Sequence, residues 1–173
     1  MEKLIIIRGP SGAGKSSLAK ALKDRSDRPT LLIEQDIFRP LFNRWGSDFQ
    51  IPIWELMEAC VKTGLENGHD VVLEGILNVQ KPGRLDFFKR LFKAHPSENY
   101  IFYVDTSFPE TLKRHNTRVE WKDKFGEKEM AEWWTLASRL GHADEIVIPE
   151  SSNLESSIEL VAKTAGLNLK EPV

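Results

Sequence analysis

The chain has very little cysteine and almost no net charge. One cysteine, Cys60, stands among 173 residues, so no disulfide can form within the chain. The 24 Lys and Arg residues nearly balance the 26 Asp and Glu residues, which leaves a formal net charge of -2. Nucleic-acid-binding domains usually carry a basic excess. The charge balance therefore disfavours a duplex-binding protein, while a nucleic-acid end stays possible as a substrate.

Long apolar runs are missing as well. No stretch approaches the roughly 20 apolar residues that a membrane-spanning helix needs, and no basic leader precedes an apolar segment with a cleavage site. We therefore expect a cytoplasmic protein with no membrane partner. The four histidines lack the spacing of zinc ligands, so we expect no transition-metal site. The length of 173 residues predicts one domain, residues 1–173.

The clearest motif is a phosphate-binding loop from Gly9 to Ser16, which matches the complete pattern G-x-x-x-x-G-K-[ST]. The apolar run from Leu4 to Ile7 precedes it and a helical pattern follows it, which is the context that such a loop requires. Its glycines let backbone N–H groups turn inward around a phosphate at a helix N-terminus. A glycine-rich turn that binds nothing is the weaker alternative. The predicted nucleotide-binding residues are Gly9, Ser11, Gly12, Ala13, Gly14, Lys15, Ser16 and Ser17.

Two side chains of the loop have predicted roles in phosphoryl transfer. Lys15 is expected to reach the β- and γ-phosphates of a nucleotide as a mobile positive charge. The hydroxyl of Ser16 is the expected ligand of Mg²⁺. The loop therefore predicts ATP and Mg²⁺ as cofactors.

Short apolar runs alternate with helical patterns along the whole chain. Such alternation is typical of an α/β fold, in which crossover helices cover both faces of a parallel sheet. We predict a three-layer, doubly wound sheet of five parallel strands. The predicted strands are 4–7, 31–33, 71–73, 100–104 and 145–148. The predicted helices are 18–25, 37–45, 53–66, 85–93, 108–118, 127–140 and 154–165.

Asp36 follows the second predicted strand, at the sheet edge where open α/β sheets bind ligands. Arg39 comes one helical turn later. Near a γ-phosphate, the carboxylate of Asp36 can take the proton of an attacking hydroxyl or order hydrated Mg²⁺, and Arg39 can bind an anionic group of the acceptor. The alternative is an ordinary solvated ion pair at a helix start.

Glu74 and Gly75 follow the third predicted strand and reach the same edge. Glu74 can coordinate Mg²⁺ through water or bind a substrate hydroxyl, and Gly75 lets the backbone approach closely. An acidic residue at a helix N-terminus is the alternative interpretation of Glu74.

Arg114 and Arg118 lie one helical turn apart and lead into a stretch dense in charge. We interpret residues 114–129 as a short lid whose arginines neutralise charge on the transferring phosphoryl group. A solvated basic helix face is the alternative.

Aromatic residues gather in two stretches, and core packing is the favoured explanation for most of them. The alternative for both stretches is the wall of an acceptor pocket, formed by stacking. The residues concerned are Phe38, Phe42, Trp45, Phe49 and Trp54 in the first stretch and Trp121, Trp133 and Trp134 in the second.

Taken together, the loop, Asp36 with Arg39, Glu74 with Gly75, the Arg114 and Arg118 segment, and the stretch from Asp144 to Ile148 resemble the small P-loop kinases. The Asp-x-x-Arg element is similar to that of polynucleotide 5′-hydroxyl kinases. Its combination with Glu-Gly resembles zeta-toxin-like sugar kinases and chloramphenicol-phosphotransferase-like enzymes. The resemblance implies a nucleoside-kinase-like fold, an Asp that activates an acceptor hydroxyl, and an adenine site near residues 151–153.

The sequence as a whole predicts an ATP- and Mg²⁺-dependent kinase that phosphorylates a hydroxyl of a small molecule or of a nucleic-acid end. The alternatives are a nucleoside monophosphate kinase, in which a phosphate is the acceptor, and an NTP-binding regulatory module without catalysis.

Overall fold

A computed structural model describes residues 1–42, 52–80, 83–94, 97–117, 125–141 and 145–171. Within them, parallel strands form one five-stranded sheet in the order β2-β3-β1-β4-β5. The α/β fold class predicted from the sequence is confirmed. The strands are β1 (Lys3–Arg8), β2 (Thr30–Glu34), β3 (Asp70–Gly75), β4 (Glu98–Asp105) and β5 (Glu145–Pro149).

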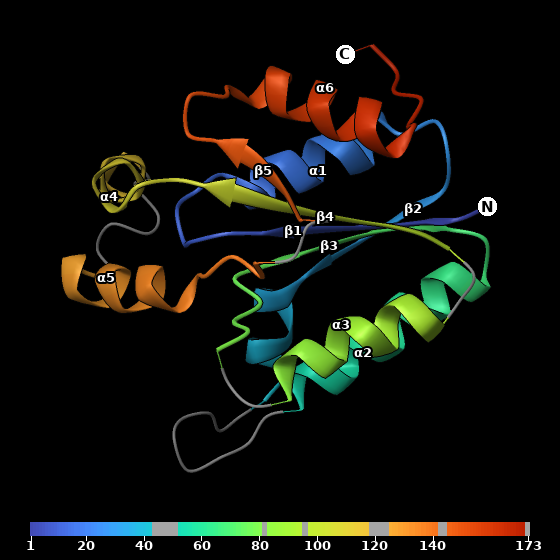
Figure 1. The fold of residues 1–173 in the computed structure, drawn as a ribbon, viewed down its shortest axis with the longest axis horizontal. Helices are drawn as coiled ribbons and strands as arrows, with labels where there is room; N and C mark the ends of the chain where they lie inside the picture. The colour runs from blue at the N-terminus through green and yellow to red at the C-terminus, as the bar shows by residue number, and fades with distance from the viewer. Residues whose placement is uncertain (43–51, 81–82, 95–96, 118–124, 142–144, 172–173) are drawn as a thin grey trace.

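Helices cover both faces of the sheet, so the molecule has three layers (Figure 1). Helices α1 and α6 lie on one face, and α2 and α3 on the other. Helices α4 and α5 lie side by side near the carboxyl ends of the strands (Figure 1). Their bounds are α1 (Lys15–Arg25), α2 (Ile53–Glu66), α3 (Arg84–Ala94), α4 (Phe108–Asn116), α5 (Glu127–Leu136) and α6 (Leu154–Ala165), and η1 (Gln35–Leu41) is a 3-10 helix.

The central strands are apolar along almost their whole length because both faces of the sheet are covered. Alternate residues of β1 point into two separate cores. Leu4 and Ile6 pack in the core under α2 and α3, whereas Ile5 and Ile7 pack in the core under α1 and α6. The two packed faces hold the carboxyl edge of the sheet in place, and the predicted site residues leave from that edge.

Local structure differs from the prediction at three places. Residues 37–41 of the predicted helix 37–45 belong to a short 3-10 helix with Pro40 inside it, because proline removes a hydrogen-bond donor from a regular helix, and residues 43–45 lie outside the described residues. Glu74 belongs to β3 itself, so its interpretation as a helix N-terminal acid is wrong. Helix α5 ends at Leu136, before the predicted end at residue 140.

The tryptophans of α5 are not core residues, contrary to the favoured interpretation. Trp134 is 37% exposed, and Trp133 is only partly buried. By contrast, Phe38 and Trp54 are buried in the core under α2 and α3, as expected. The predictions for Trp45, Phe49, Trp121 and Arg118 lie outside the described residues.

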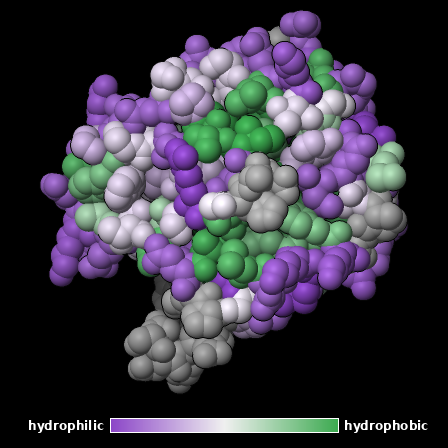
Figure 2. All heavy atoms as spheres, in the orientation of Figure 1, coloured by the Kyte–Doolittle hydropathy of each residue, from purple (hydrophilic) through white to green (hydrophobic). Residues whose placement is uncertain are grey.

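Hydrophobic and hydrophilic residues are unevenly distributed over the surface. Figure 2 shows hydrophobic residues gathered near the middle of one face and hydrophilic residues along most of its margin. Ile37 and Leu41 of η1 are exposed apolar residues close in sequence to Asp36. In the described part of the chain, none of the helices is long and apolar enough to cross a membrane.

Candidate active site

The glycines of the loop between β1 and α1 adopt backbone angles that other residues avoid. Gly9, Gly12 and Gly14 have φ values of 145°, 81° and 100°. Their surroundings are also tight. A Cβ atom on Gly9 would lie 2.6 Å from the carbonyl oxygen of Val104, and one on Gly12 would lie 2.9 Å from that of Thr111. The loop is therefore pressed against β4 and α4, with room for backbone only.

Lys15 is buried against this loop. The residue is only 7% exposed to solvent. Its Nζ donates a hydrogen bond of 2.8 Å to the carbonyl oxygen of Pro10. Lys15 is also the first residue of α1, whose N-terminal amides and dipole attract anions. The cationic side chain of Lys15 and the start of α1 thus both lie at the loop.

Ser16 connects the loop to β3. Its Oγ donates a hydrogen bond of 3.2 Å to Oε1 of Glu74, which is buried. Burial raises the pKa of Glu74, Lys15 and the Ser16 hydroxyl lower it, and the nearby Asp36 and Glu34 carboxylates raise it further. A positive charge bound beside this carboxylate would favour its ionised form.

Asp36 and Arg39 form an ion pair on η1 that is open to solvent. Nε of Arg39 lies 3.5 Å from Oδ1 of Asp36, whose side chain is 85% exposed. This geometry is that of the solvated pair expected as the alternative. Asp36 nevertheless lies on η1, which directly follows β2, and the last residue of β2, Glu34, pairs in register with Glu74, so both carboxylates lie at one edge of the sheet.

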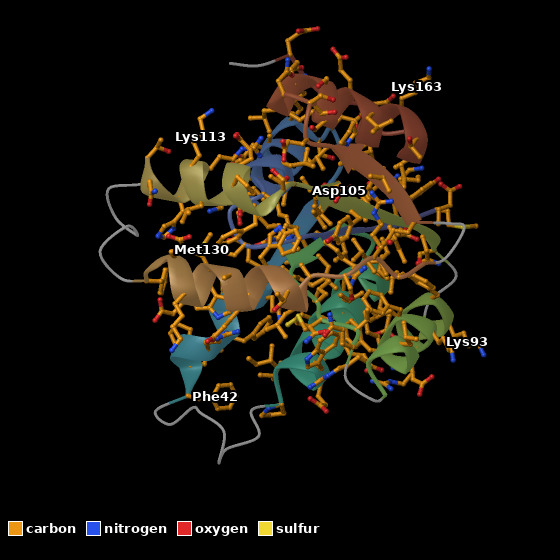
Figure 3. All side chains as sticks on the ribbon, turned by 60° about the vertical axis from the view of Figure 1, so that its left-hand side comes forward. Phe42, Lys93, Asp105, Lys113, Met130 and Lys163 are labelled. Atoms are coloured by element: carbon orange, nitrogen blue, oxygen red, sulfur yellow. The ribbon has the colours of Figure 1, made fainter. Side chains whose placement is uncertain are left out.

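Arg114 of α4 reaches the phosphate loop directly. Its Nη1 donates a hydrogen bond of 3.0 Å to the carbonyl oxygen of Ala13, and its Nε donates one of 2.9 Å to Oε1 of Glu110. The neighbouring Lys113 points away from the molecule (Figure 3). Arg114 is therefore in direct contact with the loop, whereas Arg118 lies outside the described residues.

Helix α5 closes the other side of the loop. Met130 is buried, and its methyl group would lie 3.4 Å from a Cβ atom on Gly12. Figure 3 shows Met130 on α5 below α4. The indole Nε1 of Trp134 donates a hydrogen bond of 2.9 Å to the carbonyl oxygen of Thr106. These contacts bind α5 to both the loop and the exit of β4.

A cavity of about 370 Å³ opens beside the loop. It runs from Gly14 and Ser17 to the segment after β5, where Ser152 and Asn153 line it. The side chain of Thr106 also lines it and has a buried hydroxyl without a hydrogen-bond partner in the described structure. The predicted adenine region at residues 151–153 thus faces the phosphate loop across one cavity.

Oxygen donors suited to Mg²⁺ are present at the loop. Among the described residues, no cluster of three or more His, Cys, Asp or Glu side chains is placed to hold a metal. Ser16 and Glu74 nevertheless supply a hydroxyl and a carboxylate in mutual contact. Mg²⁺ prefers oxygen ligands and binds one or two protein groups together with substrate phosphates and water, so these residues fit it.

Sequence patterns did not identify three residues that organise this edge, namely Arg8, Gln35 and Leu77. Arg8, the last residue of β1, is completely buried, and its Nη1 lies 2.6 Å from Oε1 of Glu145. Gln35, the residue before Asp36, accepts a hydrogen bond from the backbone of Leu77. A charged residue at the end of a buried apolar strand, as Arg8 is, was a signal that a buried partner must exist.

Several solved structures have a fold similar to that of this chain. A gluconokinase from Sinorhizobium meliloti has a TM-score of 0.69 and 16% identity, covering 95% of this chain and 94% of its own. The tunicamycin resistance protein from Deinococcus radiodurans has a TM-score of 0.71 and 15% identity, and the match covers 99% of this chain and 100% of that protein's chain. The APS kinase from Mycobacterium tuberculosis, in complex with AMPPNP and APS, has a TM-score of 0.71 and 14% identity, and the match covers 94% of this chain and 96% of the kinase chain.

Sequence comparison is more specific about the family. Among curated proteins, none matches this sequence significantly. The family model for the Zeta toxin matches residues 2–124, which is well over half of the chain and includes the phosphate loop, Asp36 and Glu74. This match confirms the predicted group of small P-loop kinases and the enzyme class of phosphotransferase. The chain belongs to the Zeta toxin family.

Proposed function

We propose that the protein is an ATP- and Mg²⁺-dependent kinase that transfers the γ-phosphoryl group to a hydroxyl of a small molecule. The observation that carries this proposal is the contact between Ser16 and Glu74 beneath a loop that also holds Lys15. The loop supplies a phosphate site, and the exposed carboxylate of Asp36 stands at the same edge. One edge of the sheet thus offers both a donor side and an acceptor side.

On the donor side, the nucleotide phosphates bind the backbone amides of residues 9–17. Lys15 exchanges the carbonyl of Pro10 for phosphate oxygens, since a charged acceptor is a stronger partner than a carbonyl. The base occupies the cavity that ends at residues 151–153. Ser16 would hold Mg²⁺, with Glu74 ligating it directly or through water. When bound, Mg²⁺ neutralises charge on the β- and γ-phosphates.

On the acceptor side, Asp36 is the proposed general base. Its carboxylate takes the proton as the acceptor oxygen bonds to the γ-phosphorus, while the bond from that phosphorus to the β–γ bridging oxygen breaks and ADP leaves. High exposure of the side chain leaves it accessible to a substrate entering from solvent. Arg39, paired with Asp36, is placed to bind an anionic group of that substrate.

Residues 1–173 act as one catalytic domain in this proposal, and residues 114–129 act as its lid. Arg114 already contacts the loop and would stabilise charge on the transferring group. Arg118 is the proposed second arginine of the lid. The protein would work in the cytoplasm, where ATP is available.

A small molecule is the favoured acceptor over a nucleic-acid end. The structures of similar fold include a gluconokinase and an APS kinase, whose names specify small-molecule substrates. The net charge of -2 supplies no general attraction for nucleic acid. One chain of an RNA repair complex that contains Pnkp1 also has a similar fold, but this chain covers only 44% of it. That match therefore supports a nucleic-acid acceptor less strongly than the kinases that are covered almost completely support a small molecule.

The test is a screen for phosphorylated products. The protein is incubated with Mg²⁺-ATP and the small-molecule fraction of a cell extract, and mass spectrometry identifies compounds that gain a phosphoryl group. Lys15→Ala is the matched control, since it removes the phosphate-binding charge. New phosphate esters that form with the wild type and not with the variant support the proposal. Products confined to nucleoside diphosphates would favour the monophosphate-kinase alternative, and an absence of any product would favour a non-catalytic module.

A further inference from the structure

Leu77 has an unusual backbone conformation just beyond Glu74 and Gly75. Its φ of 44° is the one positive value at a non-glycine position within the described residues. Side chains of branched residues rarely tolerate this region, so the surroundings must hold it. Leu77 is also completely buried in the core under α2 and α3. The strained and buried backbone of Leu77 is therefore held in one conformation beside the carboxyl edge of the sheet.

Side chains from two other elements hold the backbone of Leu77. Its N–H donates a hydrogen bond of 3.1 Å to Oε1 of Gln35, which begins η1. Its carbonyl oxygen accepts a hydrogen bond of 3.0 Å from Nη2 of Arg8, which ends β1. The donor loop and η1 are therefore connected through one residue.

Arg8 is a rigid anchor for this connection. The guanidinium is completely buried, pairs with Glu145 and donates a further hydrogen bond of 3.0 Å to the carbonyl oxygen of Ser138. A buried cation needs such partners, so its position is tightly determined. Since Gly9 follows Arg8 directly, Leu77 is held in place relative to the phosphate loop.

Gly75 makes space for the side chain of Gln35. A Cβ atom on Gly75 would lie 2.4 Å from Oε1 and 2.7 Å from Cβ of Gln35. Contacts this short would force η1 away from β3, because Cβ of Gln35 cannot move without its backbone. Gln35 is thus seated on β3 next to Glu74 and bonded to Leu77.

We propose that Gln35 is a positioning residue that fixes Asp36 relative to the phosphate loop. The side chain of Asp36 is 85% exposed, so its own packing does not hold it. Its position follows from the start of η1, and Gln35 ties that start to Leu77 and, through Arg8, to the donor side. The inference rests on the proposed function, because it assigns Gln35 to the acceptor half of that site.

The first experiment measures anchoring without any acceptor. Gln35→Met keeps a side chain of similar length but removes the oxygen, whereas Gln35→Glu keeps an oxygen that can accept the N–H of Leu77. Hydrogen exchange is followed at the Leu77 amide and at the amides of residues 36–41 other than Pro40, which has no N–H. The Met variant should exchange about five- to tenfold faster there, and the Glu variant should stay within about twofold of wild type. Gly75→Ala, which displaces Gln35 without changing it, should resemble the Met variant.

The control is Gln80→Met. Gln80, like Gln35, makes a hydrogen bond between its side chain and the backbone: its Nε2 donates to the carbonyl oxygen of Thr135 at 2.9 Å, and within the described residues it makes no bond to η1. This variant should leave exchange at residues 36–41 unchanged. Wild-type exchange at the Leu77 amide in Gln35→Met would overturn the inference, as would equal acceleration in the Met and Glu variants.

The second experiment measures transfer to the products found in the extract screen. Gln35→Met should lower kcat at least about tenfold with little change in the KM for ATP or in acceptor-free ATP hydrolysis, and Gln35→Glu should recover most of the rate. Loss of ATP binding in the Met variant would overturn a positioning role. If the wild type forms no product, the proposed kinase function fails, while the exchange data still decide whether Gln35 anchors Asp36.

Discussion

Ser16 Oγ and Glu74 Oε1 lie 3.2 Å apart and form a hydrogen bond between the phosphate loop and the carboxyl end of β3. Glu74 is paired in the sheet register with Ile7 of β1 and Glu34 of β2. Strand pairing on both sides therefore fixes the backbone from which the Glu74 carboxylate extends. A loop hydroxyl and a strand carboxylate in fixed contact form a preorganised oxygen pair at the point where nucleotide phosphates would arrive.

The raised pKa of Glu74 predicts a specific pH dependence of stability. The folded protein binds this proton more tightly than the unfolded chain does, so the contribution of Glu74 to the free energy of unfolding falls as pH rises above the usual glutamate pKa of about 4.3. Glu74→Gln removes this contribution. Urea unfolding of both proteins between about pH 4 and pH 7 should show the variant gaining stability relative to wild type as pH rises. A difference that is constant over this range would contradict the assignment.

A glycine of the loop should respond to substitution differently from a glycine elsewhere that also has a positive φ. Gly9→Ala should abolish ATP binding and lower stability, because the new methyl group meets the backbone of Val104 at 2.6 Å. Gly68 also has a positive φ, of 76°, but a Cβ atom there meets nothing within 4 Å. Gly68→Ala should cost only about 1 kcal/mol from backbone strain and leave ATP binding intact. Calorimetric titration with a non-hydrolysable ATP analogue separates the two outcomes.

Arg114 and Lys113 are adjacent basic residues with different orientations. Arg114 contacts the carbonyl of Ala13 in the loop, whereas Lys113 points into solvent. Arg114→Ala should lower kcat about 100-fold or more, the usual effect of removing a group that stabilises transition-state charge. Lys113→Ala should change kcat less than about twofold. Equal effects of the two substitutions would show that α4 supplies only a general positive field.

Removing only one partner of the buried pair of Arg8 and Glu145 should lower stability strongly, because the other charge then stays buried without a partner. Arg8→Met leaves the buried carboxylate of Glu145 without its cation, and such a change typically lowers stability by about 3–5 kcal/mol. The double variant with Glu145→Gln should recover part of the loss, because no buried charge remains. Urea unfolding of the wild type, both single variants and the double variant gives the coupling energy. Additive losses would contradict direct pairing.

The fold and the donor side could be predicted from local sequence patterns. The strand from Leu4 to Ile7 is apolar throughout because both of its faces are covered, and Gly9 to Ser16 is a contiguous motif whose chemistry depends on its own residues. Both features are determined within a few positions of the chain. The prediction of the sheet and of the phosphate loop therefore needed no knowledge of distant contacts.

The acceptor side depends on residues that are far apart in sequence. The connection from Arg8 through Leu77 to Gln35 joins three elements, and no periodicity or spacing relates them. The tryptophans of α5 were misjudged for a similar reason. An aromatic residue is usually buried, but Trp134 uses its indole N–H to bind Thr106 and remains partly exposed. Tertiary hydrogen bonds of this kind follow only from the assembled structure.

The most direct test of the account is the effect of Asp36→Asn on two properties measured in the same samples. Asparagine has nearly the same shape but accepts no proton at neutral pH, so transfer to the acceptor found in the extract screen should fall about 100-fold or more, the scale of general-base catalysis. The affinity for the non-hydrolysable ATP analogue should stay within about twofold, because Asp36 makes no contact with the loop in this account. Transfer at the wild-type rate by Asp36→Asn would contradict the role of Asp36 as the base and would favour an acceptor that needs none, such as a phosphate.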